Sequence, residues 1–284
     1  MITIKEFIKK YKDIPFTVIQ TLIIDFLSLT AGGFIVGLFF SNLDLNKPIG
    51  KIMNDYLLFT FPLIVIVIII VYNSKNKDLL KRFDFKKNKL LMGLALGFLM
   101  NTLCILVAYL HNDLTFSLSK VNALILIFAF ICVFVQSASE EVLCRFYLFE
   151  SIRLKHKVIL AIIINSLVFA LFHIENDGIN AISLTSLFID AIFVSLLVYY
   201  YDDMWIAMAQ HAAWNFNQAF LFGLPNSGFP AYSSLLKISS SNNSIFYDKV
   251  FGIEGTITAI IVDLLFIIIF ALINKEKTKK LFSK

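Results

Sequence analysis

The hydrophobic residues of this chain fall into eight long blocks that short polar segments separate. Most blocks have about 17 to 25 residues, the length that a helix needs to cross a hydrocarbon layer of about 30 Å. Strands of a transmembrane barrel would instead alternate over segments of about ten residues. The pattern predicts an all-α membrane protein, a single polytopic domain (1–284) with a bundle of about eight transmembrane helices. The predicted spans are 16–40, 56–72, 90–110, 122–150, 158–173, 181–201, 204–223 and 256–273.

The basic residues between the blocks predict how the chain is oriented. With the N-terminus in the cytoplasm, twenty Lys and Arg lie on the cytoplasmic side and five on the other. Cytoplasmic segments are enriched in these residues, so both termini are expected to be cytoplasmic. The net charge of +5 comes from lysines that flank the membrane, which favours contact with anionic lipid over a nucleic-acid partner. The polar stretch 224–255 is expected to be a plain loop on the outer side.

Overall composition agrees with a membrane location. The chain is 58% hydrophobic and 16% charged, whereas a soluble domain is nearer a quarter charged. Its many Lys, Asn, Ile and Phe residues resemble those of a low-GC bacterium. We therefore expect a multi-pass protein of the bacterial cytoplasmic membrane.

A pair of glutamates lies inside the fourth block. An ionisable side chain in hydrocarbon costs several kcal/mol, so each one needs a reason. Glu141 and Arg145 are four residues apart, share a helix face and are expected to neutralise each other. Glu140 is turned away by about 100° and has no expected partner in its own helix. We therefore expect a residue on another helix to be the partner of Glu140.

Two histidines and an asparagine supply candidate partners. His173 and His211 are the two histidines inside apolar blocks. Glu140 precedes His156 by 16 residues and His173 follows it by 17, so an antiparallel helix pair would place Glu140 and His173 at the same height. His211 and Asn215 are four residues apart and share a helix face.

These side chains match the needs of peptide hydrolysis in two ways. A glutamate beside a histidine polarises a water molecule, while His211 and Asn215 can donate hydrogen bonds to the resulting oxyanion. Alternatively, Glu140, His173 and His211 would ligate zinc, with water at the open fourth position. The sequence leaves both schemes open.

Three motifs in succession resemble the signatures of a known family. Glu140-Glu141-x-x-x-Arg145, Phe169-x-x-x-His173 and His211-x-x-x-Asn215 are similar to those of the CPBP family, the CAAX proteases and bacteriocin-processing enzymes also called Abi. The resemblance covers about 122–223, which we take as the catalytic core. It implies that Glu140 and His173 activate water and that His211 and Asn215 form the oxyanion hole. Glu141 and Arg145 match supporting positions.

The resemblance implies an intramembrane endopeptidase, a glutamate or metallo-endopeptidase. Its expected substrate is a membrane-associated peptide or protein, and its expected role is peptide processing or bacteriocin self-immunity. Two other functions stay open. Asp25, Asp190 and Asp263 inside spans would also suit a proton-coupled transporter. A non-catalytic membrane immunity or binding protein would keep the same motifs without cleavage.

Overall fold

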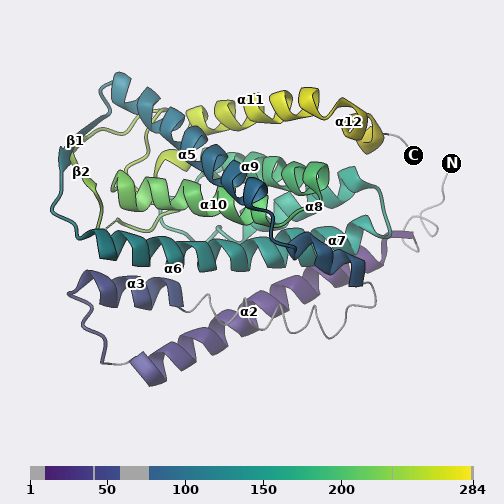
Figure 1. The fold of residues 1–284 in the computed structure, drawn as a ribbon, viewed down its shortest axis with the longest axis horizontal. Coiled ribbons are helices and arrows are strands. Elements are labelled where there is room, and N and C mark those ends of the chain that lie inside the picture. The colour runs from purple at the N-terminus through teal and green to yellow at the C-terminus, as the bar shows by residue number, and fades with distance from the viewer. Residues whose placement is uncertain (1–9, 41, 58–76, 232, 283–284) are drawn as a thin grey trace.

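The computed structural model describes residues 10–40, 42–57, 77–231 and 233–282, and most of them are helical (Figure 1). The elements in chain order are α2 (Asp13–Phe40), α3 (Pro48–Leu57), η1 (Lys77–Phe83), α5 (Lys87–Leu110), β1 (Leu114–Leu118), α6 (Ala123–Glu141), η2 (Val142–Leu148), α7 (Phe149–Arg153), α8 (Val158–Leu171), α9 (Ala181–Tyr201), α10 (Trp205–Phe216), η3 (Asn217–Leu221), β2 (Leu236–Ser241), η4 (Ile253–Gly255), α11 (Ile257–Ile273) and α12 (Lys275–Phe282).

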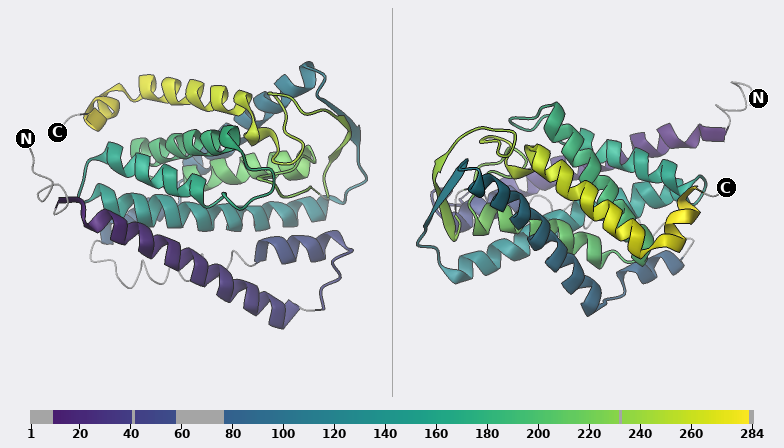
Figure 2. Two further views of the ribbon diagram at one scale, coloured as in Figure 1. Left: turned by 180° about the vertical axis from the view of Figure 1, so that it is seen from behind. Right: turned by 90° about the horizontal axis from the view of Figure 1, so that it is seen from above.

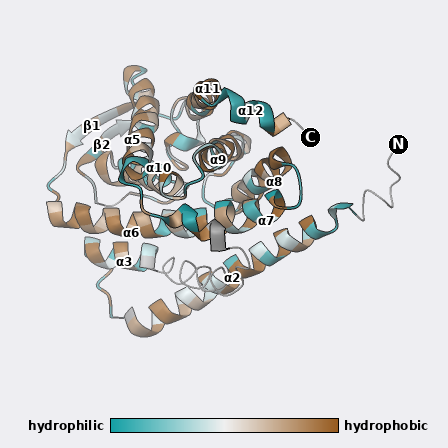
Figure 3. Cartoon of the chain, turned by 45° about the vertical axis from the view of Figure 1, so that its right-hand side comes forward, coloured by the Kyte–Doolittle hydropathy of each residue, from teal (hydrophilic) through white to brown (hydrophobic). Residues whose placement is uncertain are grey.

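The helical membrane architecture is confirmed. Four helical stretches of the described residues are long and apolar enough to cross a membrane: α2, α5, α6 with its continuation through α7, and α9. A fifth is counted if α11 and α12, which meet at a bend of 102°, form one span. Seven of the eight predicted blocks are helical, and nearly all of the block 56–72 lies outside the described residues. Figure 3 shows apolar residues along the long helices and polar residues concentrated in α12.

Helix α10 lies at the centre of the bundle, packed against α5, α6 and α9, and α2 runs along the outside against η2 and α7 (Figure 2). The contact between α10 and α5 is close because Gly93 and Gly97 of α5 face α10. A Cβ atom added at Gly97 would lie 2.1 Å from the carbonyl oxygen of Gln210. Small residues four apart let two membrane helices approach in this way.

The segment 224–255 is more structured than predicted. Its strand β2 pairs antiparallel with β1, with Leu114 opposite Ser241 and Leu118 opposite Leu236, so the expectation of a plain loop was wrong. Short strands of this kind were missed because polar residues dominate β2 and only five residues form β1. The remainder of the segment folds back over the bundle and contributes side chains to the interior.

Ion pairs of the buried side chains Arg82 and Glu150 connect three elements at one end of the bundle. Arg82 of η1 contacts both Glu150 of α7 and Asp202 after α9, and Glu150 also binds Arg153. The start of α2 and helix α12 lie at this same end (Figure 1). The first and last described helices therefore begin and finish on one side of the bundle.

Candidate active site

The four residues predicted to be catalytic line one cavity of about 430 Å³. Glu140 comes from the last turn of α6, His173 from the turn after α8, and His211 and Asn215 from α10. Residues of α2 and α3, including Asp25 and Tyr56, also line this cavity. The structure thus brings together side chains that are up to 75 residues apart in the chain.

Glu140 has one engaged and one free carboxylate oxygen. Its Oε1 accepts a hydrogen bond from Nε2 of Gln136, one turn earlier in α6. The expectation that Glu140 has no partner in its own helix was therefore wrong, because a side chain four residues away shares its face. Oε2 has no hydrogen-bond partner among the described residues and lies 3.9 Å from Nε2 of His211.

Glu141 connects the predicted ion pair to His211. Its Oε1 accepts hydrogen bonds from Nη1 of Arg145 at 3.0 Å and from Nδ1 of His211 at 2.9 Å. Glu141 and Arg145 are both fully buried, and the guanidinium of Arg145 lies 4.2 Å from the centre of the Phe169 ring. Because Nδ1 of His211 is held by Glu141, Nε2 is the nitrogen directed at Glu140. The helix widens into a π-helix directly after Glu141, a feature frequent at functional sites.

His173 lies two residues beyond the end of α8, which ends at Leu171. The prediction that it lies inside the fifth helix was wrong by this short distance. Nδ1 of His173 donates a hydrogen bond to the carbonyl oxygen of Phe169 at 3.0 Å. This contact fixes the proton on Nδ1 and leaves Nε2 as a lone-pair acceptor. The antiparallel pairing predicted to join Glu140 and His173 does bring both to the same cavity, while the ion-pair contact of Glu140 is with His211.

Gln136 was not singled out from the sequence. Its Nε2 donates to Glu140, and its Oε1 accepts from Nδ2 of Asn215 at 3.4 Å. One amide therefore joins the candidate base to the candidate oxyanion donor. The spacing of four residues between Gln136 and Glu140 was the available signal.

The geometry does not favour the zinc scheme. Within the described ranges, no group of three or more His, Cys, Asp or Glu side chains is arranged to hold a metal ion. Glu140, His173 and His211 face the same cavity without converging to that extent.

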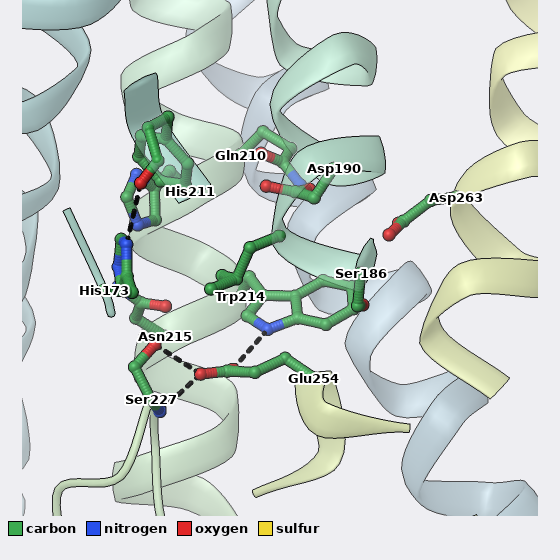
Figure 4. Close-up of a pocket in the computed structure, with 12 residues that line it drawn as sticks. His173, Ser186, Asp190, Gln210, His211, Trp214, Asn215, Ser227, Glu254 and Asp263 are labelled. Carbon is green, nitrogen blue, oxygen red and sulfur yellow. Dashed lines mark hydrogen bonds between the residues drawn. The ribbon is translucent and has the colours of Figure 1, made fainter. Parts of the chain in front are cut away.

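A second, smaller cavity lies behind the two imidazoles, and Glu254 forms part of its wall (Figure 4). Glu254 comes from η4 and accepts hydrogen bonds from the backbone and hydroxyl of Ser227 and from Nε1 of Trp214. Burial raises the pKa of Glu254 to about 7, although these hydrogen bonds oppose the shift. Its position in a polar segment gave no sequence signal that it would reach the site.

The fold and the site together define a class, a helical membrane protein with a buried glutamate–histidine centre suited to hydrolysis. Residues 122–217 match the family model described as type II CAAX prenyl endopeptidase Rce1-like. The match covers roughly a third of the chain and includes all three motifs. It confirms the resemblance of this segment to the CAAX protease (CPBP) family. No curated protein matches the chain.

Proposed function

We propose that the protein is an intramembrane endopeptidase that hydrolyses a peptide bond in a membrane-associated peptide or protein. The observation that carries the proposal is the convergence of Glu140, His173, His211 and Asn215 on one cavity of about 430 Å³. A cavity of this size accommodates a peptide segment together with water.

Water activation is assigned to Glu140 and His173. Glu140 Oε2 has no hydrogen-bond partner among the described residues and therefore has a lone pair for a water proton. Nε2 of His173 is the second acceptor, because Nδ1 donates to Phe169. The water oxygen attacks the peptide carbonyl carbon as Glu140 takes its proton. The same proton then passes to the departing amine when the C–N bond breaks.

Oxyanion stabilisation is assigned to His211 and Asn215. With Nδ1 donating to Glu141, a doubly protonated His211 presents Nε2–H to the cavity. The two carboxylates, the Arg145 guanidinium and this imidazolium then sum to zero charge, which suits a buried site. Fixed donors in a water-poor environment stabilise a developing negative charge far better than they would in bulk water.

We further propose eight spans, with both termini cytoplasmic in a bacterial membrane, and a role in peptide processing or bacteriocin self-immunity. The distribution of basic residues supports the orientation. The shared end of α2 and α12 in the bundle supports placing both termini on one side (Figure 1).

Cleavage of a library of membrane-tethered peptides, read by mass spectrometry, tests the proposal. Wild type is compared with Glu140→Gln and His173→Ala, and with Lys155→Ala as a control at the exposed end of the bundle. We expect cleavage by wild type and the control, and loss of at least 100-fold in both site variants. Cleavage is expected to persist with a chelator, whereas loss that zinc restores would support the metal scheme.

Two outcomes would favour the other functions. Cleavage that survives Glu140→Gln would refute the assignment of the base. An immunity phenotype that survives Glu140→Gln in cells would instead favour a non-catalytic binding protein. Proton flux in liposomes that requires Asp190 or Asp263 would favour a transporter.

A further inference from the structure

The smaller cavity behind the imidazoles has a volume of about 30 Å³, and we refer to it as the rear chamber. Its polar wall comes from α9, α10, α11 and η4, and it shares several side chains with the catalytic cavity (Figure 4). The residues unique to the rear chamber include Ser186, Asp190, Gln210, Trp214, Glu254 and Asp263. The residues that line both cavities are His173, His211, Asn215 and Ser227.

Two side chains of the rear chamber have polar atoms that the protein does not satisfy. Asp263 is 1% exposed, and neither of its carboxylate oxygens has a hydrogen-bond partner among the described residues. Gln210 is also 1% exposed, and its Oε1 has no such partner. Figure 4 shows the Asp263 side chain directed from α11 toward α9, and the Asp190 carboxylate beside Gln210. Buried polar atoms of this kind are costly unless a ligand completes their hydrogen bonds.

The chamber has the size and the chemistry to bind water. A cavity needs about 10 to 15 Å³ to hold one water molecule, which typically makes two to four hydrogen bonds. A volume of about 30 Å³ therefore accommodates roughly two. Glu254 differs from Asp263 because Ser227 and Trp214 already satisfy it. Among the described residues of the chamber, the polar atoms that lack a hydrogen-bond partner therefore belong to Asp263 and Gln210.

We propose that the rear chamber is a water-binding site that retains about two water molecules on Asp263 and Gln210 and supplies them to the catalytic cavity. The supply role rests on the proposed protease function, whereas water binding does not. His173, His211, Asn215 and Ser227 line both cavities, so the two cavities are neighbours and water would pass between these side chains. A hydrolase surrounded by hydrocarbon consumes one water molecule per cleavage and benefits from an internal store.

Water in the rear chamber is measured without any substrate. Radiolytic hydroxyl labelling after rapid mixing with ¹⁸O-water marks side chains next to bound, exchangeable water. Trp214 lines the rear chamber alone, and Phe220 lines the catalytic cavity alone. We expect label on Trp214 in wild type and in Asp263→Asn, a several-fold decrease in Asp263→Leu, and unchanged label on Phe220 throughout. Unlabelled Trp214 in the wild type would overturn the proposal.

The direction of the change in melting temperature is a second, independent test of whether the rear chamber contains water. If the chamber is hydrated, Asp263→Leu expels water that also forms a hydrogen bond with Gln210, and the melting temperature falls. If the chamber is dry, the same change removes an unsatisfied buried carboxylate and the melting temperature rises. Leu264→Ala, at a position on α11 that is 43% exposed, is the matched control. If sodium or another cation raises the melting temperature of the wild type but not that of Asp263→Asn, the chamber binds a cation and not water. This result would overturn the proposal.

Cleavage then tests the supply role by itself. In a library that wild type cleaves, we expect Asp263→Leu to lower kcat about tenfold or more with little change in KM, and Asp263→Asn to recover part of kcat. Normal kcat in Asp263→Leu would refute the supply role even if Trp214 is labelled. Absence of cleavage in every protein, with Trp214 labelled, would refute the protease and leave the water site standing.

Discussion

The close contact between α5 and α10 offers a sharp test of how the bundle positions the site. In Gly97→Ala, the new Cβ would lie 2.1 Å from the Gln210 carbonyl oxygen and 2.8 Å from Cβ of Ala213. Ordinary contact begins near 3.4 Å, so the two helices must separate by roughly 1.3 Å at this point. The opposing atoms are backbone and a rigid methyl group, which cannot swing aside as a long side chain would.

The shift reaches the candidate oxyanion donors directly, because Gln210 precedes His211 in α10. Overpacking by one methyl group costs about 1 to 3 kcal/mol of stability. A displacement of about 1 Å in a catalytic group costs on the order of 100-fold in rate. We therefore expect Gly97→Ala to unfold at a lower temperature in detergent and to lose on the order of 100-fold in kcat/KM.

Gly37→Ala is the matched control, since a Cβ built at Gly37 of α2 has no atom within 4 Å. We expect this variant to be as active as wild type and equally or slightly more stable, because alanine favours the helix by about 1 kcal/mol. Wild-type stability and activity in Gly97→Ala would refute the argument that this contact fixes α10. Loss in both variants would point to a general effect of the substitutions.

Three further predictions concern buried charge. Glu141→Ala should destabilise by about 3 to 5 kcal/mol, since Arg145 is left buried and unpaired, and Arg145→Leu in the same chain should recover much of the loss. Arg82→Ala should cost a similar amount, whereas Lys155→Ala, at a site 61% exposed, should change stability by less than about 1 kcal/mol. Because burial raises the pKa of Glu254 to about 7, stability should fall as pH rises from about 4.5 through 7, and Glu254→Gln should remove that dependence.

Chemical or thermal unfolding in a fixed detergent measures all three. A double variant at positions 141 and 145 no more stable than Glu141→Ala would contradict the unpaired-charge argument. Equal losses from Arg82→Ala and Lys155→Ala would show that burial does not govern these ion pairs. A stability profile of Glu254→Gln that follows the wild type between pH 4.5 and 7 would assign the dependence to another group.

The helical blocks could be predicted because hydrocarbon imposes both composition and length on a span. The ends of the helices were harder to predict. The apolar character of one or two residues does not specify where the backbone hydrogen bonds of a helix stop. Val158–Leu171 ends before His173, although 158–173 reads as one apolar block. The π-helix at Val142–Leu148 has no distinctive composition and was likewise not predictable.

The motif residues could be selected because each is a polar group in an apolar block. The rear chamber could not, since it depends on how far-separated segments pack. Asp190 and Asp263 were recognised only as unexplained acids, and nothing local showed that they line one cavity. Glu254 lies in a segment where an acidic residue is ordinary, so only its folded position makes it unusual.

Glu140 and Glu141 are adjacent in the chain but have different surroundings. This difference explains why Glu140, rather than Glu141, suits the role of base. Glu141 is fully buried, and its Oε1 accepts hydrogen bonds from both Arg145 and His211. Glu140 is 22% exposed and lines the catalytic cavity, whereas Glu141 is not among the residues that line it. Carboxylates that differ in this way commonly divide their tasks in an active site. The helical offset of about 100° between neighbouring residues is what creates the difference, because it turns one acid inward and the other toward the cavity.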